Sequence, residues 1–106
     1  MYEENKYFRI LIFGDNEKKL LIRILIILEK RNLQITFIQV KYTTTYIVDD
    51  NNNNIGQLIM IDLECLEEQL KKIIKLIRNL IGIIHIDIKI NSKKSWKLVN
   101  IPLIIY

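Results

Sequence analysis

Short stretches dense in β-branched and aromatic residues alternate along the chain with two longer stretches of helical spacing. Residues 7–13 form an apolar run of strand-forming residues that ends at Gly14, which predicts a strand. Residues 18–31 form a run too long for a strand, and leucine and isoleucine recur there every three or four positions. This spacing predicts an amphipathic helix whose buried face is Leu21, Ile24, Leu25 and Leu28.

The ends of this first helix also carry recognisable residue types. Asp15 or Asn16 is expected to cap it by accepting hydrogen bonds from the free amides of the first turn. Glu17 suits the positive end of the helix dipole, and Asn32 is expected to end the helix in a left-handed conformation.

The middle of the chain predicts a hairpin. Residues 33–48 have no helical period, and they predict one long strand or a strand that runs into a hairpin arm. The polar stretch 49–54, DDNNNN, predicts the hairpin loop, and residues 57–63 predict the strand that follows it.

A second helix and a last strand follow. Residues 64–80 place leucine and isoleucine on one helical face, with acids in the first turns and basic residues after them, and Gly82 is expected to end the helix. Residues 83–90 alternate strictly, with isoleucines on one face and His85, Asp87 and Lys89 on the other. The order βαββαβ predicts an α+β, ferredoxin-like fold, in which a four-stranded antiparallel sheet carries two helices on one face.

Length and composition bound the class of protein. The 106 residues allow one domain, and the longest apolar run, interrupted by Arg23, is too short for a membrane helix. The polar start MYEENK shows no secretory signal, and the single cysteine, Cys65, cannot form an internal disulfide. We therefore expect a soluble, cytoplasmic domain with no membrane partner.

The net charge of +4 raises the question of nucleic-acid binding. Isoleucine, lysine and asparagine dominate and alanine is absent, which is the pattern that codon drift in an A+T-rich genome produces. Because the lysines are scattered along both helices and the tail, we expect a general solvated surface and no nucleic-acid partner. A ferredoxin-like nucleic-acid-binding module remains an alternative.

Catalytic and metal-binding patterns of this fold are missing from the sequence. The first loop has neither a Cys-x-x-Cys pair for a metal nor an arginine for a phosphate, and one central strand lacks the aromatic residues of an RNA-binding sheet. His85 is interpreted as a sheet residue beside Asp87, and Cys65 as a thiol at a helix start without a base nearby. Glu67 and Glu68 are adjacent on a helix and point apart. We expect no catalytic residue, no metal site and no cofactor on this chain.

Two stretches nevertheless resemble a known family, the ACT domains in the small regulatory subunits of acetolactate (acetohydroxyacid) synthase. The family pattern acid-Asn-x-x-Gly-x-Leu-x-Arg-[Ile/Val] is matched in DNEKKLLIRI by Asp15, Asn16, Leu21, Arg23 and Ile24. The pattern around the second strand is matched in LEKRNLQITFIQV by Arg31, Ile35, Ile38 and Val40. The helix QLKKIIKLI is similar to that family's second helix, and the resemblance covers residues 7–90.

The resemblance implies an amino-acid effector site. In the family, an amino acid such as valine binds between two protomers, and its carboxylate meets backbone amides at the start of the first helix. The corresponding positions here are Asp15, Asn16, Glu17, Lys18, Lys19, Leu20, Leu21, Gln34 and Ile35. Lys19 replaces the family's loop glycine and Gln34 replaces an asparagine, so the response to valine is expected to be weakened or lost.

The resemblance also implies a function and partners. It implies a non-catalytic subunit of branched-chain amino acid biosynthesis that forms a homodimer through its ACT sheet. Such a subunit binds and activates the large catalytic subunit, which carries thiamine diphosphate, Mg²⁺ and FAD. The ACT domain is expected over 1–91, and the tail 92–106 is similar to the start of a truncated second domain. The first strand of that remnant could add to a sheet edge or lie against a partner. A stand-alone ACT domain that senses amino acids is the other alternative.

Overall fold

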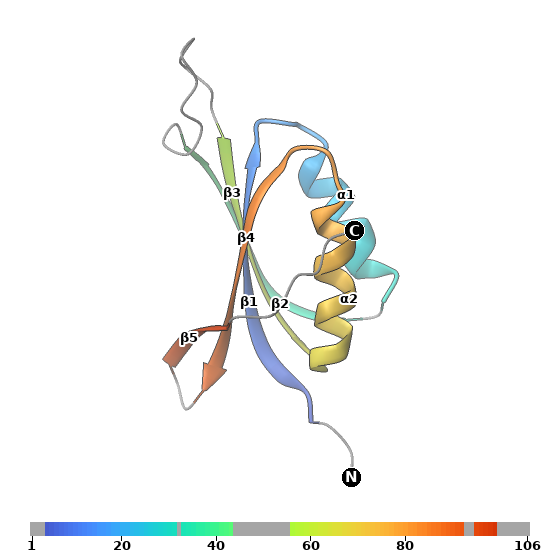
Figure 1. The fold of residues 1–106 in the computed structure, drawn as a ribbon, viewed down its shortest axis with the longest axis vertical. Coiled ribbons are helices and arrows are strands. Elements are labelled where there is room, and N and C mark those ends of the chain that lie inside the picture. The colour runs from blue at the N-terminus through green and yellow to red at the C-terminus, as the bar shows by residue number, and fades with distance from the viewer. Residues whose placement is uncertain (1–3, 32, 44–55, 93–94, 100–106) are drawn as a thin grey trace.

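A five-stranded antiparallel sheet carries two helices on one of its faces (Figure 1). The computed structural model describes residues 4–31, 33–43, 56–92 and 95–99. The elements are β1 (Lys6–Asp15), α1 (Leu20–Glu29), β2 (Gln34–Thr43), β3 (Gly56–Cys65), α2 (Glu67–Arg78), β4 (Ile83–Ser92) and β5 (Ser95–Val99). The strand order is β2-β3-β1-β4-β5, so β1 lies in the middle.

Strand β1 sets the two faces of the sheet because it pairs with a neighbour on each side. Its residues Phe8, Ile10 and Ile12 are fully buried under the helices. Residues directly opposite each other share a face, so the partners of these three on β3 and β4 are buried or half-buried on the same side. These partners are Leu63, Ile61 and Ile59 on β3 and Ile90, Ile88 and Ile86 on β4.

The helices complete the core with stripes of three- and four-residue spacing. Helix α1 buries Leu20, Ile24 and Leu28, while Leu21 and Leu25, two of its four predicted core positions, are only half-buried. The buried stripe therefore lies to one side of the predicted face, and the helix begins at Leu20, two residues later than expected. Helix α2 contributes Leu70, Ile73, Ile74 and Ile77. At about 1.5–3 kcal/mol for each fully buried aliphatic side chain, this layer is the main stabilising term.

The predicted βαββαβ order and the four-stranded sheet are confirmed, with a fifth strand added. Strand β5 pairs antiparallel with β4, from Ser92 opposite Ser95 to Ile88 opposite Val99. The expected extension of the second strand over 44–48 and the loop 49–54 lie outside the described residues, as do 93–94 and 100–106 of the tail.

Helix α2 begins at Glu67 and not at residue 64 as predicted, because β3 continues to Cys65 opposite Lys6. At its start, the Gln69 side-chain oxygen accepts a hydrogen bond of 2.9 Å from the Leu66 amide. The helix ends at Arg78, and Gly82 follows with a φ of 101°, in the turn that leads into β4.

We predict that Ile10→Ala lowers the free energy of unfolding by about 2–5 kcal/mol, because it opens a cavity at the centre of the core. Ile22→Ala is the control, since Ile22 is 58% exposed on α1 and its change should stay within about 0.5 kcal/mol. Urea unfolding followed by circular dichroism measures both. Equal losses in the two variants would contradict the burial of Ile10.

Candidate effector loop

Several successive hydrogen bonds hold the segment between β1 and α1 in place. The Asp15 amide donates to the Gly82 carbonyl oxygen at 2.8 Å, which ties the loop to the turn before β4. The Asp15 carboxylate accepts from the Glu17 amide at 3.1 Å, and the Glu17 carboxylate accepts from the Lys19 amide at 3.3 Å. Two amides of the loop are therefore already bonded to carboxylates of the same chain.

The predicted cap of α1 is wrong. The residue at the cap position is Lys19, and no side chain makes a capping hydrogen bond there. Asp15 and Asn16 lie too far before Leu20 to reach the first turn, and the Asp15 carboxylate closes a tight turn onto Glu17 instead. At the other end, α1 ends at Glu29 with Lys30 as the C-cap, and Asn32, the predicted terminator, lies outside the described residues.

Gln57 fastens the loop to the sheet. Its side chain is 4% exposed, and its Nε2 group donates to the carbonyl oxygens of Asp15 and Glu17, both at 2.9 Å. Gln57 is not among the residues predicted from the sequence to form the effector site. The signal is the alternation of β3, in which a glutamine occupies an inward position that the strand otherwise fills with Ile59, Ile61 and Leu63.

Two glycines allow the loop to approach its neighbours closely. A Cβ atom on Gly14 would lie 2.5 Å from Leu20 Cδ2 and 3.1 Å from the Gly82 oxygen. A Cβ atom on Gly82 would lie 2.7 Å from Asp15 Oδ1, at a φ that L side chains rarely adopt. The start of α1, the end of β1 and the turn before β4 are thus packed together without room for side chains at these positions.

The structure places the predicted effector residues in two groups. Asp15 to Leu21 surround the loop, where Asn16, Lys18 and Lys19 are exposed, Glu17 and Leu21 are half-buried, and Leu20 is fully buried. Gln34 and Ile35 lie at the other end of the sheet. Gln34 is opposite Glu64, which is opposite Tyr7, whereas the loop begins at Asp15. At about 3.3 Å per residue, the eight residues from Tyr7 to Asp15 separate the groups by about 26 Å. One chain alone does not bring them together.

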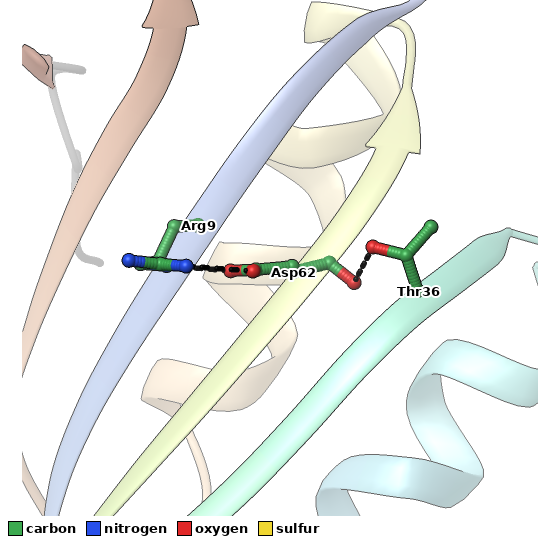
Figure 2. Close-up of polar contacts among 3 residues, drawn as sticks. All are labelled: Arg9, Thr36 and Asp62. Carbon is green, nitrogen blue, oxygen red and sulfur yellow. Dashed lines mark hydrogen bonds and ion pairs between the residues drawn. The ribbon is translucent and has the colours of Figure 1, made fainter. Parts of the chain in front are cut away.

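The open face of the sheet carries paired charges. Arg9 on β1 donates two hydrogen bonds to the Asp62 carboxylate on β3, at 2.7 and 2.9 Å, and the bond to Asp62 raises the pKa of the Arg9 guanidinium (Figure 2). Thr36, at the bulge of β2, donates through its hydroxyl to the Asp62 carbonyl oxygen at 3.2 Å. These contacts join the three strands β1, β3 and β2 in one row across the face.

His85 and Asp87 lie on the open face, as their alternation predicts. His85 Nε2 is 2.8 Å from Asp87 Oδ1, and the His85 ring stacks on Phe13 with 5.9 Å between the ring centres. Both partners of the pair are substantially exposed, so the arrangement is that of a surface ion pair or hydrogen bond.

Cys65 is a buried strand residue. The prediction that it begins a helix is wrong, because it is the last residue of β3 and 2% exposed. Burial raises the pKa of its thiol to about 11, against a smaller lowering by a hydrogen bond with the Leu70 backbone. The thiol is therefore protonated at neutral pH, which fits a structural role.

No group of three or more His, Cys, Asp or Glu side chains suited to a metal ion occurs within the described residues. In the same part of the chain, neither helix has the length and apolar character needed to cross a membrane.

One solved structure shares this architecture over most of the chain. It is the crystal structure of the ACT domain from the GTP pyrophosphokinase of Chlorobium tepidum, with a TM-score of 0.58 and 14% sequence identity. The match covers 79% of this chain and 97% of that domain. The chain has the fold of an ACT domain. By sequence, no protein-family model and no curated protein matches it.

We predict that Gln57→Leu lowers the free energy of unfolding by about 1–3 kcal/mol, because the Asp15 and Glu17 carbonyls lose a buried donor. Gln39→Leu, on the exposed part of β2, is the control and should change stability by less than about 0.5 kcal/mol. Urea titration compares the two. A Gln57→Leu variant as stable as Gln39→Leu would show that the loop does not depend on this amide.

We also predict that the titration of the Cys65 thiol lowers the free energy of unfolding at high pH. The folded state raises the pKa of this thiol to about 11 and so favours the protonated form. The buried thiol contributes fully to the free energy of unfolding below pH 9, which is near the pKa of the thiol in the unfolded chain. This contribution, about 1–3 kcal/mol, is lost as the pH rises through 11. Unfolding of the native chain and of Cys65→Val between pH 8 and 11 isolates this component. Parallel curves for the two proteins would contradict it.

Proposed function

We propose that this chain is a non-catalytic regulatory subunit of acetolactate synthase that binds the large catalytic subunit and raises its activity. The observation that carries the proposal is the coincidence of fold and motif. The chain has the ACT architecture, and Asp15, Asn16, Leu21 and Arg23, which match the family pattern, lie where β1 passes into α1. Thiamine diphosphate, Mg²⁺ and FAD would belong to the large subunit.

The geometry of the loop supports activation with a weak response to valine. An effector carboxylate would have to compete with the chain's own carboxylates, because Asp15 and Glu17 accept from the amides of Glu17 and Lys19. Lys19 adds an exposed side chain where the family has glycine. The mechanism we propose is therefore stabilisation of an active conformation of the partner by protein contact, which is a coupling between two proteins.

The edge strand β2 supports a homodimer. All of its described side chains are exposed except Ile35 and Val40, and Phe37, Ile38 and Tyr42 are 45%, 39% and 71% exposed. The strand is ten residues long, and Lys41 is its only charged residue. A long edge with so little charge favours pairing with another strand. We propose that two copies pair through their β2 edges into one continuous sheet, which is how the homodimer would form.

The proposal predicts that the chain raises the rate of an acetolactate synthase large subunit from the same source and co-purifies with it. The ACT domain of the Chlorobium tepidum GTP pyrophosphokinase, added at the same concentration, is the control for a merely shared fold. Acetolactate formation is the readout, without valine and with it, and we expect valine to change the stimulated rate by less than twofold. A chain that neither binds the large subunit nor changes its rate would contradict the proposal.

A stand-alone amino-acid sensor is the second candidate, and the likeness to an ACT domain of an unrelated enzyme favours it. Equilibrium dialysis against valine, leucine and isoleucine tests it, with Lys19→Gly as the matched variant. Saturable binding by the native chain, without any effect on the synthase, would favour the sensor. Binding by Lys19→Gly alone would identify Lys19 as the residue that closes the site.

A further inference from the structure

The two edges of the sheet are treated differently by this chain. Strand β4, ten residues long, would be an edge of a four-stranded ferredoxin-like sheet, and here β5 pairs along it from Ser92 to Ile88 (Figure 1). Strand β2, at the opposite edge, has no strand on its outer side among the described residues. Half of one long edge is covered, whereas no described strand covers any part of the other.

We propose that β5 is an edge cover that limits the assembly of this chain to a closed pair of copies joined at β2. The proposal concerns how the chain assembles, and it holds whichever enzyme the chain regulates. A second copy of this chain pairs with the β2 edge, and β5 prevents a third copy from pairing with the β4 edge.

The physical reason lies in the symmetry of strand pairing. Without β5, each copy would present two unlike edges of ten residues, β2 and β4. Pairing of the β2 edge of one copy with the β4 edge of the next is a head-to-tail contact, and repetition of such a contact that does not close gives an open filament. Because β5 occupies the Ile88–Ser92 half of β4, only five residues of that edge stay open, and β2 finds a partner for its full length only in another β2. This two-fold contact uses up both β2 edges.

Strand β5 is itself a poor edge for further growth. It has five residues, one of which is the charged Lys97, and short or charged edge strands are the usual protection against pairing. The only proline of the chain, Pro102, follows three residues after Val99, and proline has no amide hydrogen to donate to a ladder.

Removal of β5 need not unfold the domain. The buried hydrophobic cluster from Phe8 to Ile88 is assembled by β1, α1, β3, α2 and β4. A full-length variant that cannot form β5 should therefore keep its core and expose the β4 edge.

The test uses the full chain with two consecutive prolines in β5, Lys97→Pro and Leu98→Pro, so that one of them removes an amide that faces β4. The matched control, Lys97→Ala and Leu98→Ala, changes the same two side chains and keeps both amide hydrogens. Circular dichroism checks that both variants are folded, and sedimentation velocity over a hundredfold range of concentration measures their size.

We expect the native chain and the control to sediment as no more than a dimer, about twice the chain mass of 12.7 kDa. The variant without β5 should form a series of larger species that grows with concentration. The proposal is overturned if that variant is no larger than the control, or if the native chain itself grows beyond a dimer. A monomeric native chain would overturn both the homodimer proposed above and the closed pair at β2, whatever the size of the β5 variant.

A second variant distinguishes pairing of strand edges from non-specific aggregation. Gln39→Lys and Tyr42→Lys add charge to the β2 edge at two exposed positions, next to Lys41. Combined with the β5 prolines, they should stop growth at a dimer, since only β4 edges remain to pair. Continued growth in this combination would show that the larger species do not form through β2, and would overturn the proposal.

Discussion

The pairing of β1 on both sides is the constraint on which the rest of the molecule depends. Because β3 and β4 are hydrogen-bonded to it in register, the inward positions of all three strands are decided together. A shift by one residue would move Phe8, Ile10 and Ile12 to the open face and place Arg9 under the helices. The bidentate contact of Arg9 with Asp62 on the open face reinforces the same register, since these two residues are directly opposite each other.

Most of the fold could be predicted from the sequence because period and element type are strong local signals. The alternation of residues 83–90 and the three- and four-residue stripes of the helices indicate strands and helices directly. The ends of the elements were harder to predict. Cys65 continues β3 because it is paired with Lys6 on a strand 59 residues earlier, and no local pattern reports such a partner.

The hydrogen-bonding roles of side chains in the loop were also hard to predict from the local sequence. Asp15 has the side chain of a helix cap and stands near a helix start, so the local interpretation was reasonable. Its tertiary contacts decide otherwise, because the Gly82 carbonyl and the Gln57 amide hold its backbone before the helix begins. Gln57 itself is recognisable only once β3 is known to face the helices at that position. The role of Lys19 as the residue that closes the site stays a prediction.

The Glu17 and Lys19 amides of the loop are bonded to carboxylates of the same chain, and we propose that regulation therefore acts through protein contact. Nuclear magnetic resonance of the amides of Glu17 and Lys19, recorded while valine is added to the native chain, tests this most directly. We expect both signals to keep their positions up to millimolar valine, because the Asp15 and Glu17 carboxylates already bond to these amides. A saturable shift of both signals would contradict it and would show that the loop still opens for an amino acid.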